Sequence, residues 1–304
     1  MKNSDFIENF INILKSTDKC FTYEFSTPCS FSLESYFSLF TPELLKHLDA
    51  FVCTDSPLAK LKHNASLASL KLQNTFNIPS ITTMSMRDKN TLALQSEIIG
   101  MNSLDLRLIL SLTGDSPKLG NQPQCKGVFE GNSTLLLKLI ASLNRKQDIN
   151  SQNIHGEHKT IYGFSVLNSY SNKKESLYKK MKQKIIHGAQ AIFTQPVYDL
   201  QIAKELVAWN EEINKTYNTN AILMLGFFPI TSYKTALFLH NKLPGVHVPT
   251  YWLESLKKAQ DDNNEEIVGL QKSKNLFESI KAFHPKIHLM SANKPQLIQS
   301  ILND

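Results

Sequence analysis

Short apolar runs alternate along the chain with longer segments in which apolar residues recur at helical spacing. The runs are rich in Ile, Val, Phe and Thr and are nearly continuous in apolarity, as expected of strands that are covered on both faces. Each of them stops at a polar residue. The eight runs occupy residues 21–25, 50–53, 80–86, 108–112, 161–167, 191–193, 221–228 and 287–290.

The segments between these runs predict helices. Thr41-Pro42-Glu43 is typical of a helix start, with an N-cap followed by proline at the first helical position. Asp55-Ser56-Pro57 predicts a similar start for a helix that reaches Leu72. Apolar periodicity predicts further helices over residues 92–101, 134–143, 175–187, 200–217, 233–241, 251–260 and 264–283. Residues 144–159 are polar and predict an exposed or mobile loop.

Most of the strand runs begin roughly thirty residues apart, which is the length of one βαβ unit. Eight such units in series predict an α/β fold, a single (β/α)8 TIM barrel with an N-terminal extra helix over residues 1–15. We find no linker, so we expect residues 1–304 to form one domain. Active sites of this fold lie at the C-terminal ends of the strands, where the polar residues stand.

Composition adds limits on the partners. Hydrophobic residues make up 41% of the chain and charged residues 20%, which is typical of a globular protein. The net charge of +6 is a mild excess that favours anionic ligands. Residues 173–184 are rich in lysine, but Leu177, Met181 and Ile185 form an apolar stripe among them. This segment therefore predicts a solvated helix face, and we expect no nucleic acid partner.

The cysteines and the N-terminus indicate the compartment. The four cysteines show no CxxC spacing and are too few for a disulfide scaffold, which favours a reducing cytoplasm. The N-terminal segment alternates charges with apolar residues, unlike a signal peptide. No run approaches the length of a membrane span, so we expect no membrane association.

Glu24 is the first candidate for chemistry, because it stands between Tyr23 and Phe25 inside an apolar strand. A carboxyl group buried among aromatic rings has a raised pKa and can act as a general acid near neutral pH. The alternative is a strand residue that faces solvent. The residue alone favours neither interpretation.

Other strand ends carry weaker signals. In Thr113-Gly114-Asp115, the glycine permits close backbone approach to a ligand. The alternative is an ordinary turn in which Asp115 caps a helix. The side-chain amide of Gln195 can bind a heterocycle through two hydrogen bonds. The alternative is an amide that makes hydrogen bonds to backbone groups of its loop. Arg87 and Asp88 are equally consistent with a functional pair and a simple ion pair.

His155 and His158 form the one pattern that suggests a metal. Their neighbours are polar, and no predicted helix holds both imidazoles on one face. A surface loop is favoured, and we expect no metal site.

In order along the chain, these segments resemble the methylenetetrahydrofolate reductase family in its short, catalytic-domain-only bacterial form. The resemblance extends almost from end to end. It rests on residues 23–25 (Tyr-Glu-Phe), 52–55 (Val-Cys-Thr-Asp), 86–90 (Met-Arg-Asp-Lys-Asn), 112–117 (Leu-Thr-Gly-Asp-Ser-Pro), 194–199 (Thr-Gln-Pro-Val-Tyr-Asp), 226–234 (Gly-Phe-Phe-Pro-Ile-Thr-Ser-Tyr-Lys), 244–249 (Pro-Gly-Val-His-Val-Pro) and 288–293 (His-Leu-Met, with Asn at 293).

This resemblance implies a flavoprotein that reduces 5,10-methylenetetrahydrofolate to 5-methyltetrahydrofolate by a ping-pong route. NADH or NADPH would give a hydride to FAD, with FMN the less favoured flavin, and leave before the folate binds the same face. The family serves methionine biosynthesis and one-carbon metabolism. Both a homo-oligomer and a partner electron-transfer subunit remain open.

The resemblance also implies roles for individual residues. Glu24 would be the general acid that protonates a ring nitrogen of the folate, and Asp115 the carboxylate near pterin and flavin. Gln195 and Tyr233 match residues that contact the folate, and Lys294 stands where the family has an arginine. The cofactor contacts would be Thr54, Asp55, Arg87, Thr113, Gly114, Asp115, Asn168 and Lys184.

A second hypothesis comes from a departure from the family pattern. Residues 83–86 read Thr-Met-Ser-Met where the family has His-Leu-Thr-Cys, so the imidazole that faces the flavin in the family is missing. The alternative is a divergent barrel that has lost flavin and acts as a folate-binding or complex-forming subunit.

Overall fold

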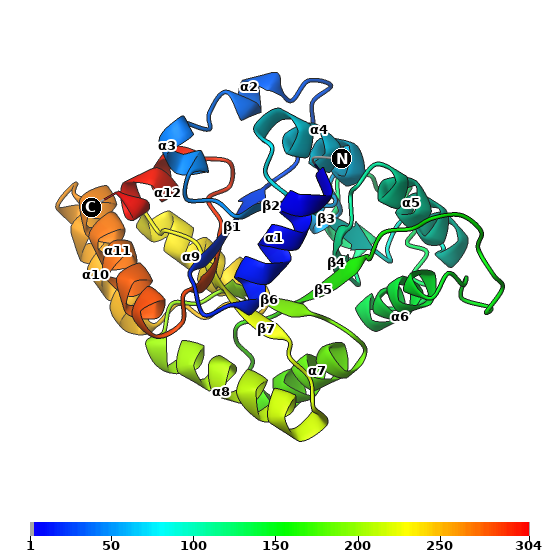
Figure 1. Cartoon of the computed structure of the whole chain (residues 1–304). Helices are drawn as coiled ribbons and strands as arrows, with labels where there is room; N and C mark the ends of the chain where they lie inside the picture. Colours follow the sequence, from blue (N-terminus) through cyan, green and yellow to red (C-terminus); the bar gives the residue numbers. More distant parts are fainter. Residues whose placement is uncertain (1–2, 304) are drawn as a thin grey trace.

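The computed structural model describes residues 3–303 and contains a closed barrel of eight parallel strands that follow one another in chain order (Figure 1). The predicted (β/α)8 barrel is confirmed. Its strands are β1 (Cys20–Phe25), β2 (Ala50–Cys53), β3 (Ser80–Ser85), β4 (Leu108–Leu112), β5 (Tyr162–Leu167), β6 (Ala191–Pro196), β7 (Ile222–Phe227) and β8 (Lys286–Leu289).

Helices surround this barrel and, apart from the first one, lie outside it (Figure 1). They are α1 (Asn3–Lys15), α2 (Glu34–Phe37), α3 (Pro42–Leu45), α4 (Ala65–Phe76), α5 (Thr91–Ser103), α6 (Ser133–Asn144), α7 (Lys174–Ile186), α8 (Leu200–Tyr217), α9 (Tyr233–Lys242), α10 (Thr250–Asp261), α11 (Glu265–Phe283) and α12 (Pro295–Leu302). Two single 3₁₀ turns, η1 (Pro57–Ala59) and η2 (Pro117–Leu119), follow β2 and β4. In residues 3–303, no helix combines the length and the apolarity that crossing a membrane requires.

One predicted helix start is wrong. Ser56-Pro57 begins only the 3₁₀ turn η1, because Leu58 adopts left-handed backbone angles (φ 55°) that a helix cannot continue through. The helix α4 begins instead at Ala65, where the side chain of Asn64 accepts a hydrogen bond from the backbone N–H of Leu67. Asn64 is thus the N-cap of α4, and asparagine is among the residues preferred at that position.

The interior of the barrel is filled by one apolar cluster, and α1 closes it at the end where the strands begin. Ile7, Phe10, Ile11 and Leu14 of α1 are at most 3% exposed and belong to the same cluster as the inward-facing strand residues. Figure 1 shows α1 lying across the strands. The predicted N-terminal helix is therefore the plug of the barrel; the first two residues assigned to it lie outside the described range.

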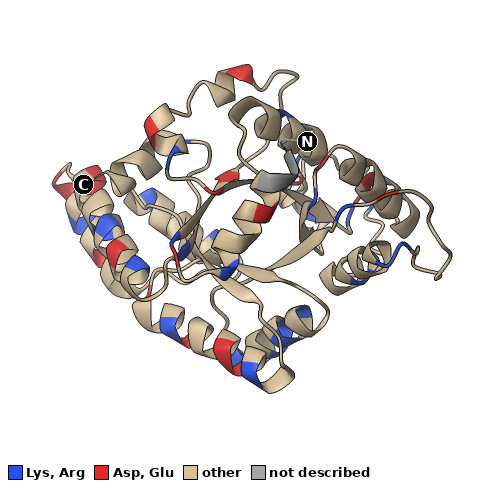
Figure 2. Cartoon of the chain, viewed as in Figure 1, with Lys and Arg blue, Asp and Glu red and all other residues tan. Residues whose placement is uncertain are grey.

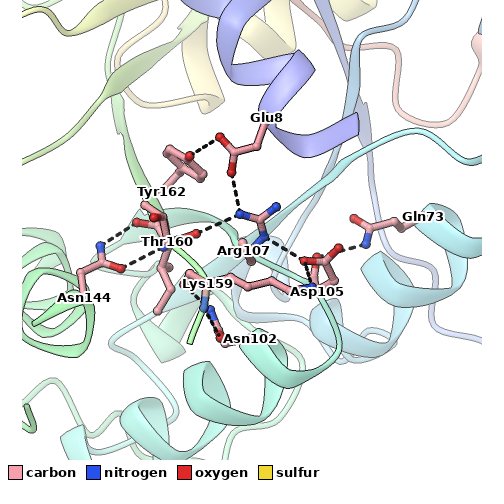
Figure 3. A network of polar contacts seen from close by, with 10 residues as sticks. Glu8, Gln73, Asn102, Asp105, Arg107, Asn144, Lys159, Thr160 and Tyr162 are labelled. Carbon is pink, nitrogen blue, oxygen red and sulfur yellow. Dashed lines mark hydrogen bonds and ion pairs between the residues drawn. The ribbon is translucent and has the colours of Figure 1, made fainter. Parts of the chain in front are cut away.

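Polar contacts hold this plug in place (Figure 3). Glu8 of α1 accepts hydrogen bonds from Arg107 at 2.8 Å and from the hydroxyl of Tyr162 at 2.6 Å, next to the starts of β4 and β5. Desolvation alone would raise the pKa of Glu8, but the bonds from Tyr162 and Arg107 outweigh it and lower that pKa. Arg107 also pairs with Asp105 at 2.9 Å.

Two surface predictions are confirmed. Of the predicted loop 144–159, Asn144 is the last residue of α6 and residues 145–159 form a mostly exposed loop, with a short bridge between Gln147 and Asn153. Leu177, Met181 and Ile185 are the buried residues of α7, whose lysines are coloured blue in Figure 2. Lys174, Lys179 and Lys180 are exposed, whereas Lys184 is only partly exposed. His155 and His158 are exposed, and the described part of the chain holds no cluster of three or more metal-ligating side chains.

Candidate functional site

Glu24 stands near the end of β1 and faces the inside of the barrel. Its neighbours Tyr23 and Phe25 point outward into the layer between strands and helices, where they pack on aromatic rings such as Phe40. The Glu24 side chain is 30% exposed, more than the enclosed carboxyl that the sequence suggested. The carboxylate therefore lies between the apolar interior and the solvent at the mouth of the barrel.

His288 lies beside this carboxylate, and the sequence interpretation gave it no role. It is 4% exposed. Its Nε2 lies 3.8 Å from Oε2 of Glu24, and its Nδ1 lies 2.9 Å from the hydroxyl oxygen of Thr22. The ring packs edge-on against Phe193 with 5.3 Å between centroids. The alternation of side chains along β8 could have indicated this position. The apolar Ile287 and Leu289 face the helices, so His288 between them faces the inside of the barrel.

Gln195 is presented by an irregular stretch of β6. The pairing of β6 with β7 shifts between Phe193 and Pro196, and the hydroxyl of Thr194 accepts a hydrogen bond from the N–H of Gly226. A Cβ on Gly226 would lie 2.3 Å from the carbonyl oxygen of Thr194. Glycine is required there because the bulged backbone approaches so closely. The partly exposed amide of Gln195 makes no hydrogen bond within residues 3–303.

Tyr233 and Lys294 lie on the same side of the mouth, after β7 and β8. The ring of Tyr233, at the start of α9, packs on the core, and its N–H donates to the carboxylate of Glu265 at 2.9 Å. Lys294 is exposed and lines an open cavity of about 820 Å³ together with Thr231 and Glu265. The predicted substrate residues thus stand in or after β6, β7 and β8, and β8 pairs with β1, which carries the predicted acid Glu24.

The residues predicted to hold the cofactor are spread over the other half, β2–β5. Thr54 accepts a hydrogen bond from the N–H of Thr27 at 3.1 Å, and Asp55 accepts one from the N–H of Ser85 at 3.0 Å. Desolvation raises the pKa of Asp55. Both side chains therefore hold neighbouring strand ends together, whatever ligand they meet.

Arg87 is buried, and its guanidinium is already occupied. It pairs with Asp88, with 2.6 Å between Nη2 and the carboxylate, and donates from Nη1 to the carbonyl of Ser56 at 3.1 Å. The ion pair between Arg87 and Asp88 is therefore present, and it is compatible with both interpretations of these residues. Together they line a groove of about 120 Å³.

Asp115 does not cap a helix. Its exposed carboxylate accepts a hydrogen bond from the N–H of Leu58 at 2.6 Å and so joins the loop after β4 to the loop after β2. Gly114 has a φ of 95°, and a Cβ there would lie 2.7 Å from Cβ of Arg87. Thr113 accepts a hydrogen bond from the N–H of Ser133, at the start of α6. Asp115 and Glu24 thus stand on different halves of the mouth.

Lys184 reaches from α7 into the space between α6 and β5. Its amine donates to the hydroxyls of Ser133 and Ser165, both at 3.0 Å. Desolvation, assisted by the charge of Lys180, lowers the pKa of Lys184 to about 8. Ser133 is the first residue of α6, where the helix dipole favours negative charge. This arrangement of amine and helix start is suited to an anionic group.

Asn168 is exposed after β5 and packs against Gly245, whose φ is 80°. A Cβ on Gly245 would lie 2.1 Å from Cγ of Asn168. The contact joins the end of β5 to the 244–249 segment, so Asn168 lies at the edge of the mouth.

Comparison with known proteins gives the family. A family model described as methylenetetrahydrofolate reductase matches residues 9–304. Among solved structures, an uncharacterized protein from Clostridium thermocellum that binds two copies of 5-methyl-5,6,7,8-tetrahydrofolic acid has a TM-score of 0.64 and 14% identity, over 97% of this chain and 95% of that chain. A 2,3-dimethylmalate lyase of the PEP mutase/isocitrate lyase superfamily has a TM-score of 0.47 and 13% identity, over 91% of this chain and 96% of that chain. No curated protein matches significantly.

The likeness to the Clostridium thermocellum protein concerns the fold. The family model is the stronger finding, because it aligns with the whole barrel, including both halves of the mouth. Since it matches the chain from residue 9 to residue 304, this protein belongs to the methylenetetrahydrofolate reductase family.

Proposed function

We propose that this protein is a flavin-dependent reductase that converts 5,10-methylenetetrahydrofolate to 5-methyltetrahydrofolate in the cytoplasm. The observation that carries the proposal is the half-buried carboxyl of Glu24 at the barrel mouth, beside the buried imidazole of His288. The folate that the similar Clostridium thermocellum protein binds is the product of this reaction, which supports the substrate class.

Glu24 is the proton donor in this proposal. Its 30% exposed side chain can reach a ligand in the mouth and exchange protons with solvent afterwards. Protonation of a ring nitrogen of the folate opens the imidazolidine to an iminium, and positioned general acids of this kind contribute roughly 10²–10⁴-fold to rates. The carboxylate that remains is held beside His288.

The neighbouring residues bind and orient the folate. Gln195 has both a donor and an acceptor free within residues 3–303, which suits the paired acceptor and donor on the edge of a pterin. Tyr233 offers an aromatic face, and Lys294 a cation for the glutamate carboxylates. All three stand on the same half of the mouth as Glu24.

The other half would hold the flavin, and the residues there fit its phosphates. Lys184 is a largely buried amine whose hydrogen bonds go to hydroxyls, at the start of α6, where phosphate oxygens bind well. Asp115 would act on the flavin and pterin through its charge. When bound, the flavin supplies the hydride that reduces the iminium carbon, after receiving electrons from NADH, NADPH or a partner subunit. The remaining contacts in the proposal are Thr54, Asp55, Arg87, Thr113, Gly114 and Asn168.

A second candidate is a folate-binding barrel without flavin. The observation that favours it lies at the end of β3, where Arg87 is occupied by Asp88 and the groove encloses about 120 Å³. Typical ligand pockets enclose roughly 300–1,000 Å³. A ligand of flavin size would therefore enter this groove only if the loops after β2 and β4 moved apart.

Absorption spectroscopy separates the two candidates. Flavin bands in the purified protein, or after incubation with FAD or FMN, support the reductase. A protein that stays colourless after both, yet binds 5-methyltetrahydrofolate, supports the second candidate. In the loaded protein, Glu24→Gln should abolish reduction of the folate while the electron donor still bleaches the flavin. Loss of both half-reactions in a folded, loaded variant would contradict the role of Glu24.

A further inference from the structure

His288 occupies a position that packing alone does not explain. A 4% exposed imidazole in the wall of an apolar barrel is costly unless its nitrogens find partners. Thr22 is its register partner on β1, and Glu24 stands two residues further along the same strand and on the same face. The two ring nitrogens therefore face two side chains of one strand.

The partners determine which nitrogen carries the proton. An ionised carboxylate can only accept a hydrogen bond, whereas a threonine hydroxyl can donate or accept. Both contacts are satisfied when the hydroxyl of Thr22 donates to Nδ1 at 2.9 Å and Nε2 carries its proton toward Glu24. Phe193 lies edge-on against the ring at 5.3 Å and limits its rotation.

The other charged and titratable groups near this pair are directed elsewhere. Lys286, two residues earlier on β8, sends its amine to the carbonyl of Ile13 in α1, at the opposite end of the barrel. The hydroxyl of Tyr23 faces outward and bonds to Ser291 at 2.6 Å. Within residues 3–303, His288 is thus the one polar side chain in contact with the carboxylate of Glu24.

We infer that His288 is a positioning residue for Glu24, an inference that rests on the proposed function. When the O–H bond of Glu24 breaks and the proton bonds to the folate nitrogen, a negative charge remains on the carboxylate. The Nε2–H of His288, oriented by Thr22, donates to that charge. The present separation of 3.8 Å is longer than a hydrogen bond, and such contacts in unliganded sites commonly tighten when the ligand binds.

Two substitutions distinguish the contribution of Nε2 from that of Nδ1. His288→Gln places an amide nitrogen near the position of Nε2, and His288→Asn keeps a polar group only near the position of Nδ1. In single-turnover reactions of the flavin-loaded protein, His288→Asn should slow folate reduction on the order of 10²-fold, the typical cost of one lost donor to a developing charge. His288→Gln should recover most of that loss, and reduction of the flavin by the electron donor should not change.

The same substitutions in a Glu24→Asp background test whether His288 acts through Glu24. The shorter side chain keeps an acid for the reaction but withdraws it from His288, so His288→Asn should cause much less additional loss there than in the native protein. A second measurement needs no cofactor: ring ¹⁵N shifts of His288 should indicate the Nε2–H tautomer, and Thr22→Val should weaken that preference.

The outcomes distinguish this inference from the proposed function. Equal losses in His288→Asn and His288→Gln, or the Nδ1–H tautomer in the native protein, would overturn the role of His288 while leaving the reductase intact. A native, flavin-loaded protein that does not reduce the folate would overturn the proposed function, and the role of His288 with it.

Discussion

The carboxylate of Asp115, after β4, accepts a hydrogen bond of 2.6 Å from the backbone N–H of Leu58, after β2. Two loops that flank β3 are therefore joined above the end of that strand. The contact between Gly120 and Ala59, where a Cβ on the glycine would lie 2.2 Å from the carbonyl oxygen, brings them equally close. Any ligand on this half of the mouth has to fit beside this bridge or open it.

Removal of the bridge should loosen the loop after β2. We expect Asp115→Ala to increase hydrogen exchange at Leu58 and to lower the free energy of unfolding by about 1 kcal/mol, because the lost hydrogen bond is exposed to solvent. Asp115→Asn keeps an acceptor at the same place and should show a smaller change. Equal exchange at Leu58 in the native protein and Asp115→Ala would mean that the bridge does not order the loop.

Lys184 should make stability depend on alkaline pH. Its pKa is about 8 in the folded protein and near 10.5 in the unfolded chain, so between these values the unfolded chain binds more protons. Stability from this residue therefore rises as pH increases from 8 toward 10.5, by roughly 1–3 kcal/mol. Lys184→Met should abolish that rise, measured by urea unfolding at pH 7, 8.5 and 10.

Lys179 provides the control, because it stands on the same helix and is exposed. Lys179→Met should leave the pH dependence almost unchanged. A bound phosphate group would favour the charged amine of Lys184, so adding the flavin should reduce the alkaline rise in the native protein. An alkaline rise that persists in Lys184→Met would mean that another group causes it.

Gly226 should not tolerate a side chain. In Gly226→Ala, the new Cβ would lie 2.3 Å from a backbone oxygen of β6, so the bulge that presents Gln195 has to move. We expect a loss of about 1–3 kcal/mol in unfolding free energy together with weaker folate binding by titration calorimetry.

A second glycine gives the opposite expectation. Gly100 lies in α5, and a Cβ added there would have no atom within 4 Å beyond the neighbouring backbone of its own helix. Gly100→Ala should therefore stabilise the protein by about 0.5–1 kcal/mol and leave folate binding unchanged. Native-like folate binding by Gly226→Ala would show that the bulge does not position Gln195.

The plug formed by α1 should contribute strongly to stability. Phe10 is 1% exposed and fills the base of the barrel interior, so Phe10→Ala should cost about 3–5 kcal/mol in urea unfolding. Phe31 is fully exposed, and Phe31→Ala should change the unfolding free energy by less than about 0.5 kcal/mol. A similar small change in both variants would show that the barrel is stable without its plug.

Most of the fold followed from local patterns in the chain. Apolar strands that alternate with amphipathic helices bury their apolar residues efficiently in a barrel. Their regular spacing therefore predicted the closed barrel and the end of it at which the active site lies. The predicted helix start at Pro57 was wrong because Leu58 has left-handed backbone angles, and its N–H bonds to Asp115, 57 residues later, instead of continuing a helix.

The candidate site was predictable only in part. Glu24 and Gln195 could be selected because each polar group stands in or next to an apolar segment, where it is costly without a partner. Lys184 was selected only through the resemblance to the family. Which of them meet depends on barrel closure, since only closure places β8 beside β1 and His288 next to Glu24, 264 residues apart in number. Closure likewise separates Asp115 from Glu24 and leaves Arg87 paired with Asp88. Sequence carries the chemistry of each side chain, but the distances between them arise when the first and last strands pair.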